Sequence, residues 1–269
     1  MSERNAYILG TDHDELFRLG IQHQVWSTET NKGWSLAGFT AGQTLLDLGC
    51  GPGFCTKELA LITGTSGKVI GVDKSETYIH FLSKITQQFG LNINAVLTDF
   101  DSMELQPNSI DGGYCRWAMA WISNPKDVIA KVYEAMKPGG RFVFHEYFHW
   151  MTHQTIPSFN SLTKAIQECY NSFQSFEGDI NVGRDLPKIC TDLGFKIFST
   201  RPLAKTARPH ELTWQWPKTF YQTYFPKLVE LNKLTKSEAD SALLELSKLE
   251  EQPEALLCCP MMIEIIVEK

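Results

Sequence analysis

Three glycines within five positions, Gly49, Gly51 and Gly53, directly follow the apolar run LLDL at residues 45–48. Glycines let a chain turn sharply and let a ligand lie directly against the backbone. Dinucleotide-binding turns of the form G-x-G-x-x-G use this property to hold a pyrophosphate. Here the loop reads G-C-G-P-G, and Phe54 stands where that fingerprint needs its third glycine. The spacing predicts a ligand-binding turn, and a tight turn without a ligand is the simpler alternative.

Three carboxylates, Asp47, Asp73 and Asp99, lie near the ends of three successive apolar runs. A carboxylate after the second run can accept hydrogen bonds from both hydroxyls of a ribose, although Asp73 could also be an ordinary helix N-cap. Asp99 could accept from an adenine amine, with Phe100 against the ring, or be a solvated loop residue. Asp47 would repel a pyrophosphate but attract an ammonium or sulfonium group. Together they indicate a ligand with ribose and adenine at one end and positive charge at the other.

Alternating strands and helices must position these side chains. Strands are predicted over residues 44–48, 68–72, 95–98, 111–116 and 141–147, with helices between them. This alternation predicts βαβ units with right-handed crossovers. The fold class is therefore α/β, a doubly wound, mostly parallel, Rossmann-like sheet. Ligands of such sheets bind outside the carboxyl ends of the strands, where the glycines and carboxylates fall.

The bulk properties favour a small-molecule partner. The chain has 269 residues, a formal net charge of -6 and no basic stripe, which argues against nucleic acid or an anionic membrane surface. Its seven cysteines lack a regular spacing and are expected to be free thiols in a reducing compartment. There is no signal-peptide pattern and no apolar run of bilayer-spanning length, so a cytoplasmic location is expected. The sequence leaves a homodimer open.

Several motifs, taken in order, resemble those of the class I S-adenosylmethionine-dependent methyltransferases. They are LLDLGCGPG, VIGVDKS, LTDF, SIDGGYCRWAMAWISNP and KPGGRFVFHEYF, and they cover residues 40–150. YILGTDHDELFRLGIQHQVW and VGRDLPKICTDLGF are also similar to a small-molecule branch related to the quinone-biosynthesis methyltransferases. The resemblance implies seven strands, the last one antiparallel. It also implies an enzyme of the EC 2.1.1 type that moves a methyl group from S-adenosylmethionine to a small organic acceptor by in-line displacement.

The resemblance further implies a set of cofactor-binding residues. They are Asp47, Gly49, Gly51 and Gly53 under the methionine part, Asp73 and Lys74 at the ribose, Asp99 and Phe100 at the adenine, Arg116 and Trp117 beside the methionine, and Tyr7 and Gln22 closing over the cofactor.

The segment FHEYFHWMTH at residues 144–153 contains the candidates for acceptor chemistry. Alternation along a strand puts His145 and Tyr147 on the same side, so both are predicted to contact substrate or cofactor as catalytic residues. A base is needed only if the nucleophile is a hydroxyl or a protonated amine. Three histidines spaced by four would suit a metal on a helix, but a strand breaks that geometry and no metal is predicted. The fold does not reveal which atom is methylated.

Residues 1–40 are expected to form a helical cap over the cofactor, and residues 41–269 a methyltransferase domain with helical substrate-cap insertions at about 150–182 and 205–257. The aromatic segment TWQWPKTFYQTYFPKL, at 213–228, could wall a substrate or pack a lid. Two alternative functions stay open: a nicotinamide-dependent oxidoreductase and a non-catalytic S-adenosylmethionine-binding protein of the same fold. Asp47 and the absent third glycine argue against the first.

Overall fold

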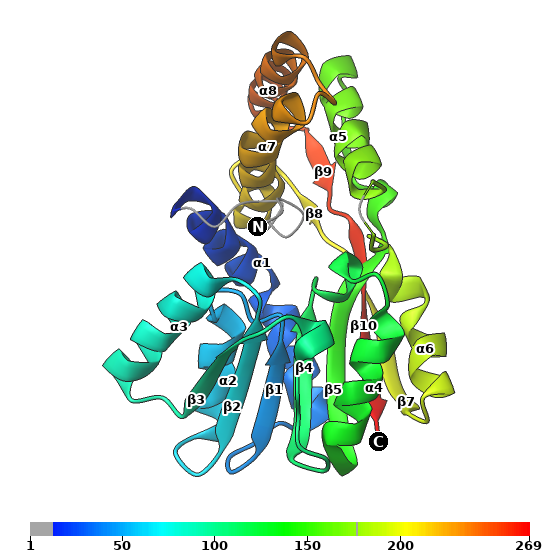
Figure 1. Ribbon diagram of the computed structural model, residues 1–269. Coiled ribbons are helices and arrows are strands. Elements are labelled where there is room, and N and C mark those ends of the chain that lie inside the picture. The colour runs from blue at the N-terminus through cyan, green and yellow to red at the C-terminus, as the bar shows by residue number, and fades with distance from the viewer. Residues whose placement is uncertain (1–12, 176) are drawn as a thin grey trace.

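The computed structural model describes residues 13–175 and 177–269 of the chain (Figure 1). Seven strands form one sheet in the order β3-β2-β1-β4-β5-β10-β7. Their bounds are β1 (Thr44–Leu48), β2 (Lys68–Asp73), β3 (Ile93–Leu97), β4 (Ile110–Arg116), β5 (Met136–His149), β7 (Lys196–Leu203) and β10 (Met261–Glu268). Strand β10 lies between β5 and β7 and runs antiparallel to both. The predicted doubly wound, seven-stranded sheet with an antiparallel last strand is confirmed.

Four helices connect the strands: α2 (Phe54–Thr63), α3 (Glu76–Phe89), α4 (Pro125–Ala135) and α6 (Leu186–Asp192). Local signals account for the ends of α3. The Ser75 side chain accepts a hydrogen bond from the Tyr78 backbone N–H at 3.3 Å, and Gly90 ends the helix in the left-handed region at φ 61°. Because α2, α3 and α4 each come after a parallel strand of the sheet, the loops that lead into them lie at its carboxyl edge.

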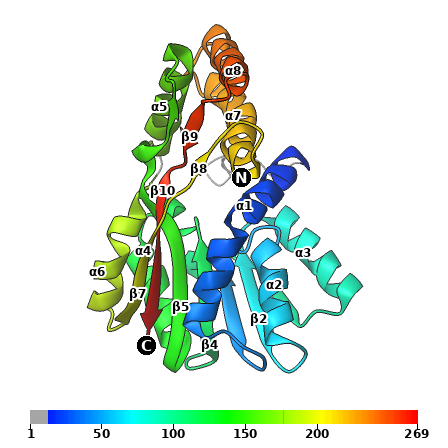
Figure 2. The same ribbon diagram turned by 180° about the vertical axis from the view of Figure 1, so that it is seen from behind.

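The N-terminal helix α1 (His13–Ala37) crosses one face of the sheet and continues beyond its carboxyl edge (Figure 2). Its inner face is fixed by Trp26 and Trp34, which are fully buried; Trp34 packs edge-on against Tyr114 of β4 with ring centroids 5.3 Å apart. Burial of aromatic area of this size anchors a helix strongly to a sheet. Phe17, near the start of α1, is 61% exposed because that end of the helix extends beyond the sheet.

Beyond the carboxyl edge of the main sheet stands a second group of elements, made of three helices and a small antiparallel sheet (Figure 1). The helices are α5 (Asn160–Phe173), α7 (Leu212–Glu230) and α8 (Lys236–Glu250), and the strands, in spatial order, are β6 (Gln154–Ile156), β9 (Leu256–Cys258) and β8 (Thr206–Ala207). We call this group the cap. A capping box between Thr235 and Glu238 opens α8.

The aromatic segment at residues 213–228, to which the sequence analysis assigned no element of its own within the insertion at about 205–257, lies in helix α7. Pro217 and Pro226 lie inside α7. A proline inside a helix removes one backbone hydrogen bond. Here burial compensates for that loss, because Trp214, Tyr221 and the other inward aromatics of α7 pack against the rest of the cap.

Two further expectations concern the whole chain. All seven cysteines are free, as predicted, and all but Cys258 are buried. Among the helices that the structure describes, none combines the length and the apolar character that crossing a bilayer requires.

Candidate functional site

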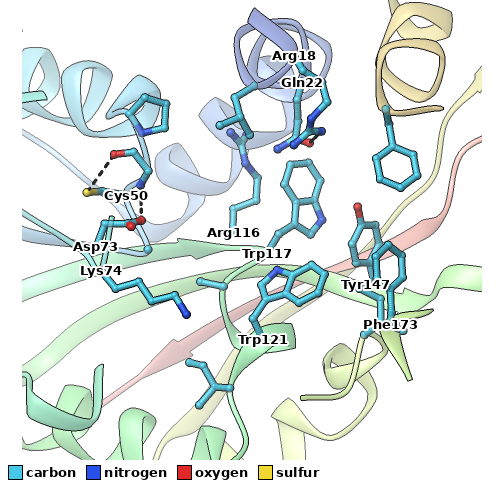
Figure 3. A pocket seen from close by; sticks show the side chains of 18 of the residues that line it. Arg18, Gln22, Cys50, Asp73, Lys74, Arg116, Trp117, Trp121, Tyr147 and Phe173 are labelled. Atoms are coloured by element: carbon cyan, nitrogen blue, oxygen red, sulfur yellow. Dashed lines mark hydrogen bonds between the residues drawn. The ribbon is translucent and has the colours of Figure 1, made fainter. Parts of the chain in front are cut away.

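A cavity of about 1190 Å³ lies between the carboxyl ends of β1, β2, β4 and β5 and the cap (Figure 3). In Figure 3, Asp73 and Lys74 lie on one side, Tyr147 and Phe173 on the other, and Trp117 between them. Sites for a single drug-sized molecule measure about 300–1,000 Å³. The cavity is therefore larger than one such molecule needs.

The glycine loop forms the floor of this cavity. Gly49, Gly51 and Gly53 all have positive φ, at 76°, 51° and 84°. Gly49 and Gly51 line the cavity, and a β-carbon on Gly49 would come within 2.5 Å of the Ala118 Cβ. Gly53 is not among the lining residues; it is the N-cap of α2 and packs so tightly on Leu82 that a β-carbon would lie 2.4 Å from Cδ1. Gly49 and Gly51 therefore face the cavity, whereas Gly53 allows the tight turn from the loop into α2.

Asp73, at the end of β2, joins this loop to the next helix. Its Oδ2 accepts a hydrogen bond from the Gly51 N–H at 2.8 Å, and its Oδ1 accepts one from the Ser75 N–H at 2.8 Å. Burial raises the pKa of Asp73, although the two backbone hydrogen bonds act in the opposite direction. Each carboxylate oxygen keeps a second lone pair for a ligand hydroxyl, and Lys74 lines the cavity beside it.

Asp99 and Phe100 follow β3, the strand next to β2, and both line the cavity. Asp99 is exposed, and its side chain accepts a long, 3.4 Å hydrogen bond from the Asp101 N–H. Phe100 is half-buried and begins a short 3₁₀ turn. Asp99 therefore offers a hydrogen-bond acceptor, and Phe100 an aromatic ring, at the same end of the cavity as Asp73.

Opposite charges face the cavity at β1 and β4. Asp47 is nearly fully buried, and its Oδ2 accepts a 2.6 Å hydrogen bond from the Thr56 hydroxyl. Burial raises the pKa of Asp47 to about 6, whereas the Thr56 hydroxyl and the Arg116 guanidinium lower it. Arg116 donates to the Thr30 hydroxyl at 3.1 Å and forms no ion pair with any residue that the structure describes. A carboxylate and a guanidinium at one end of a cavity suit a zwitterion.

Trp117 holds a backbone conformation that side chains seldom adopt, with φ 55°. Its indole stacks between Tyr147, at a ring-centroid distance of 5.7 Å, and Trp216 of α7, at 5.5 Å. The Glu146 side chain, fully buried, accepts hydrogen bonds from the Ala118 and Met119 N–H groups at 3.0 and 2.9 Å. Glu146 therefore fixes the turn that presents Trp117 to the cavity.

Of the two predicted catalytic residues, Tyr147 lines the cavity and His145 does not. His145 is fully buried beneath α1, where Nε2 lies 2.9 Å from Glu264 Oε2 and Nδ1 lies 3.1 Å from the Tyr114 hydroxyl. Burial lowers the pKa of His145, although the Glu264 carboxylate acts in the opposite direction. Alternation along a strand predicts which face of the sheet a side chain lies on, but it does not predict whether another element covers that face. At His145 the face is covered by α1. The structure does not support contact of His145 with a substrate.

His153, the last of the three histidines in the candidate segment at residues 144–153, does line the cavity. Its Nδ1 lies 2.8 Å from the Cys258 carbonyl oxygen, to which it donates, and its Nε2 accepts from the Tyr221 hydroxyl. Burial lowers its pKa to about 4, so the ring is neutral near pH 7. The histidines of residues 144–153 do not come together, and within residues 13–175 and 177–269 no cluster of three or more His, Cys, Asp or Glu could hold a metal.

Gln22 connects α1 to the cap above the cavity. Its Oε1 accepts hydrogen bonds from Trp216 Nε1 at 2.9 Å and from Arg18 Nη1 at 3.1 Å. Arg18, which also lines the cavity and pairs with Glu15 at 2.6 Å, carried no signal in the sequence beyond its place near the predicted Gln22. Tyr7, the other residue predicted to close over a cofactor, lies outside the described residues.

Comparisons with known proteins agree with this architecture. The chain is 25% identical over 214 residues to the sterol 24-C-methyltransferase of Eremothecium gossypii, an alignment that covers 76% of this chain and 53% of the relative. It is 28% identical over 160 residues to the demethylmenaquinone methyltransferase of Lactococcus lactis, covering 59% and 60%. The chain thus spans little more than half the length of these relatives.

Among solved structures, the fold is similar to that of a putative methyltransferase from Bacillus halodurans, with a TM-score of 0.59, 14% identity and coverage of 90% of this chain and 99% of the other. The sequence model of the family described as "Methyltransferase domain" matches residues 39–209, more than half of the chain. The resemblance seen in the motifs is confirmed, and the chain belongs to this methyltransferase domain family.

Proposed function

We propose that the chain binds S-adenosylmethionine in this cavity and transfers its methyl group to a small organic acceptor. The observation that carries the proposal is the distribution of polar groups in one cavity. Asp73, Asp99 and Phe100 offer acceptors and an aromatic face at the end where a nucleoside would lie. Asp47 and Arg116 offer opposite charges at the end where an amino acid would lie. A nicotinamide dinucleotide would instead place its pyrophosphate near Asp47.

When bound, S-adenosylmethionine supplies a methyl group that its sulfonium has already activated. The task of the chain is then to bind, to align and to exclude water. Asp47 and Arg116 would hold the ammonium and carboxylate groups, and the bare backbone of Gly49 and Gly51 would permit close contact. The stacked rings of Tyr147, Trp117 and Trp216 would shield the reacting carbon from solvent.

Calorimetric titration with S-adenosylhomocysteine tests the site. Asp99→Ala and Arg116→Met each remove a charged hydrogen-bonding partner and should weaken binding by about 1–3 kcal/mol. The matched control is Asp240→Ala, on the exposed face of α8, where Asp240 forms an ion pair with Lys236 outside the cavity lining. Unchanged affinity in both site variants, with the fold intact, would refute the assignment. Binding of NAD without any response to S-adenosylhomocysteine would instead favour the oxidoreductase alternative.

We also propose that the N-terminal region closes over the cofactor through α1 and that the insertions at about 150–182 and 205–257 enclose the acceptor. The hydrogen bond between Gln22 and Trp216 supports the first proposal, because it joins α1 to α7. Phe173 and Phe220 support the second, because both cap residues line the cavity. We infer a cytoplasmic location for the enzyme because its cysteines are free. We infer a small-molecule partner, and no nucleic acid, because its formal net charge is -6. A homodimer remains compatible with this proposal.

A further inference from the structure

We propose that the methyl acceptor is an elongated, predominantly apolar molecule whose reacting end lies at Tyr147 and whose body extends along α7. This inference rests on the proposed function, since it takes the Asp73 end of the cavity as the cofactor site. It adds the class of acceptor, which neither the motifs nor the cofactor residues specify.

The first observation is the length of the cavity along α7. The lining residues Trp216, Phe220, Lys227 and Leu231 are separated by four, seven and four positions, so they share one face of the helix. From Trp216 to Leu231 is 231 - 216 = 15 residues, which at about 1.5 Å each spans about 22 Å of helix. A compact acceptor would need only the first turn or two of that face.

The second observation is the apolar character of the cavity wall beside α7. Phe173 of α5 packs against Phe220 with ring centroids 6.4 Å apart, and Trp121 meets Phe173 edge-on at 5.5 Å. Trp150 also contacts Phe173, at 5.6 Å. All four side chains line the cavity, and together they form one continuous aromatic wall along its middle. Such a surface recognises apolar area and offers little to a strongly polar molecule.

The third observation concerns charge at the far end. Lys227 forms an ion pair with Glu230 at 2.7 Å, so its charge is already balanced where the cavity meets the last turn of α7. Leu231, next to this pair, is 39% exposed, which shows that this end opens to solvent. A neutral or weakly polar tail fits there, whereas a phosphorylated tail would meet the Glu230 carboxylate, which also lines the cavity.

A homologous series of straight-chain alcohols tests the inference by binding, without turnover. Hexanol, decanol, tetradecanol and octadecanol, the longer ones carried on cyclodextrin, are titrated by calorimetry into the protein saturated with S-adenosylhomocysteine. If the groove accepts an extended chain, each added methylene strengthens binding about fourfold, the factor that about 0.8 kcal/mol gives. Leu231→Asp should weaken octadecanol binding at least tenfold and leave hexanol unchanged, because only the longest chain reaches the end of α7.

The matched control is Leu244→Asp, which changes a leucine of α8 that is 57% exposed and outside the cavity lining. It should bind every alcohol as the unmodified protein does. Affinity that stops rising after hexanol, or equal losses in both aspartate variants, would overturn the elongated acceptor while S-adenosylhomocysteine still binds. Failure of S-adenosylhomocysteine itself to bind would overturn the proposed function, and with it this inference.

Discussion

Replacing Gly33 by alanine should destabilise the protein, although helix propensity predicts the opposite. Gly33 lies inside α1, where a change to alanine ordinarily gains about 1 kcal/mol. In the folded chain, however, a β-carbon at this position would lie 2.4 Å from Glu264 Oε2 and 3.3 Å from His145 Nε2. The new methyl group would therefore enter the buried polar cluster beneath α1.

The Glu264 carboxylate has little freedom to move away. It is fully buried, and its Oε2 lies 2.9 Å from His145 Nε2 and accepts a 2.7 Å hydrogen bond from Arg201, which also binds Oε1 at 3.0 Å. Overpacking costs about 1–3 kcal/mol. Losing one hydrogen bond to a charged group costs about 1.5–3 kcal/mol. After the gain in propensity is subtracted, we expect a net loss of about 2 kcal/mol or more in the free energy of unfolding.

Gly20→Ala in the same helix is the matched control. A β-carbon at Gly20 would lie 3.5 Å from the Phe54 ring, an ordinary van der Waals distance, so this variant should gain up to about 1 kcal/mol. Urea denaturation followed by tryptophan fluorescence measures both changes. If Gly33→Ala is as stable as the unmodified protein while Gly20→Ala is stabilised, the packing argument beneath α1 is wrong.

Two other predictions concern Glu146 and α1. Burial raises the folded-state pKa of Glu146 to about 8 from 4.5, so the stability it contributes is complete below about pH 4.5 and is lost as the pH rises through 8. As the pH rises between these values, the unmodified protein should therefore lose stability relative to Glu146→Gln by up to about 1.4 kcal/mol per pH unit. If the urea midpoints of the two proteins differ by the same amount at pH 5 and at pH 8, this prediction is wrong. If α1 closes over the cofactor, S-adenosylhomocysteine should slow amide hydrogen exchange around Gln22, whereas identical exchange with and without it would count against closure.

The elements around the glycine loop were predictable because their signals are local. The predicted strand over residues 44–48 matches β1 residue for residue, and α3 begins after its Ser75 cap and ends at Gly90. Periodicity and capping depend on neighbours within a few positions, so the sequence carries them directly. The same holds for the carboxylates Asp73 and Asp99, because parallel strands necessarily bring their carboxyl ends to one edge.

Only the tertiary structure decided how the cap is built and which residues near the carboxyl edge reach the cavity. Helix α7 forms through Pro217 and Pro226 because its buried aromatics pack on α1, α5 and α8, contacts between residues far apart in the chain. His145 and Tyr147 share a strand, yet α1 covers the first and leaves the second open to the cavity. The sequence by itself therefore determined the sheet and the polar edge that marks it as a ligand site. Segments distant in the sequence cover some of these side chains and leave others exposed to the cavity. This burial determined which side chains can act there.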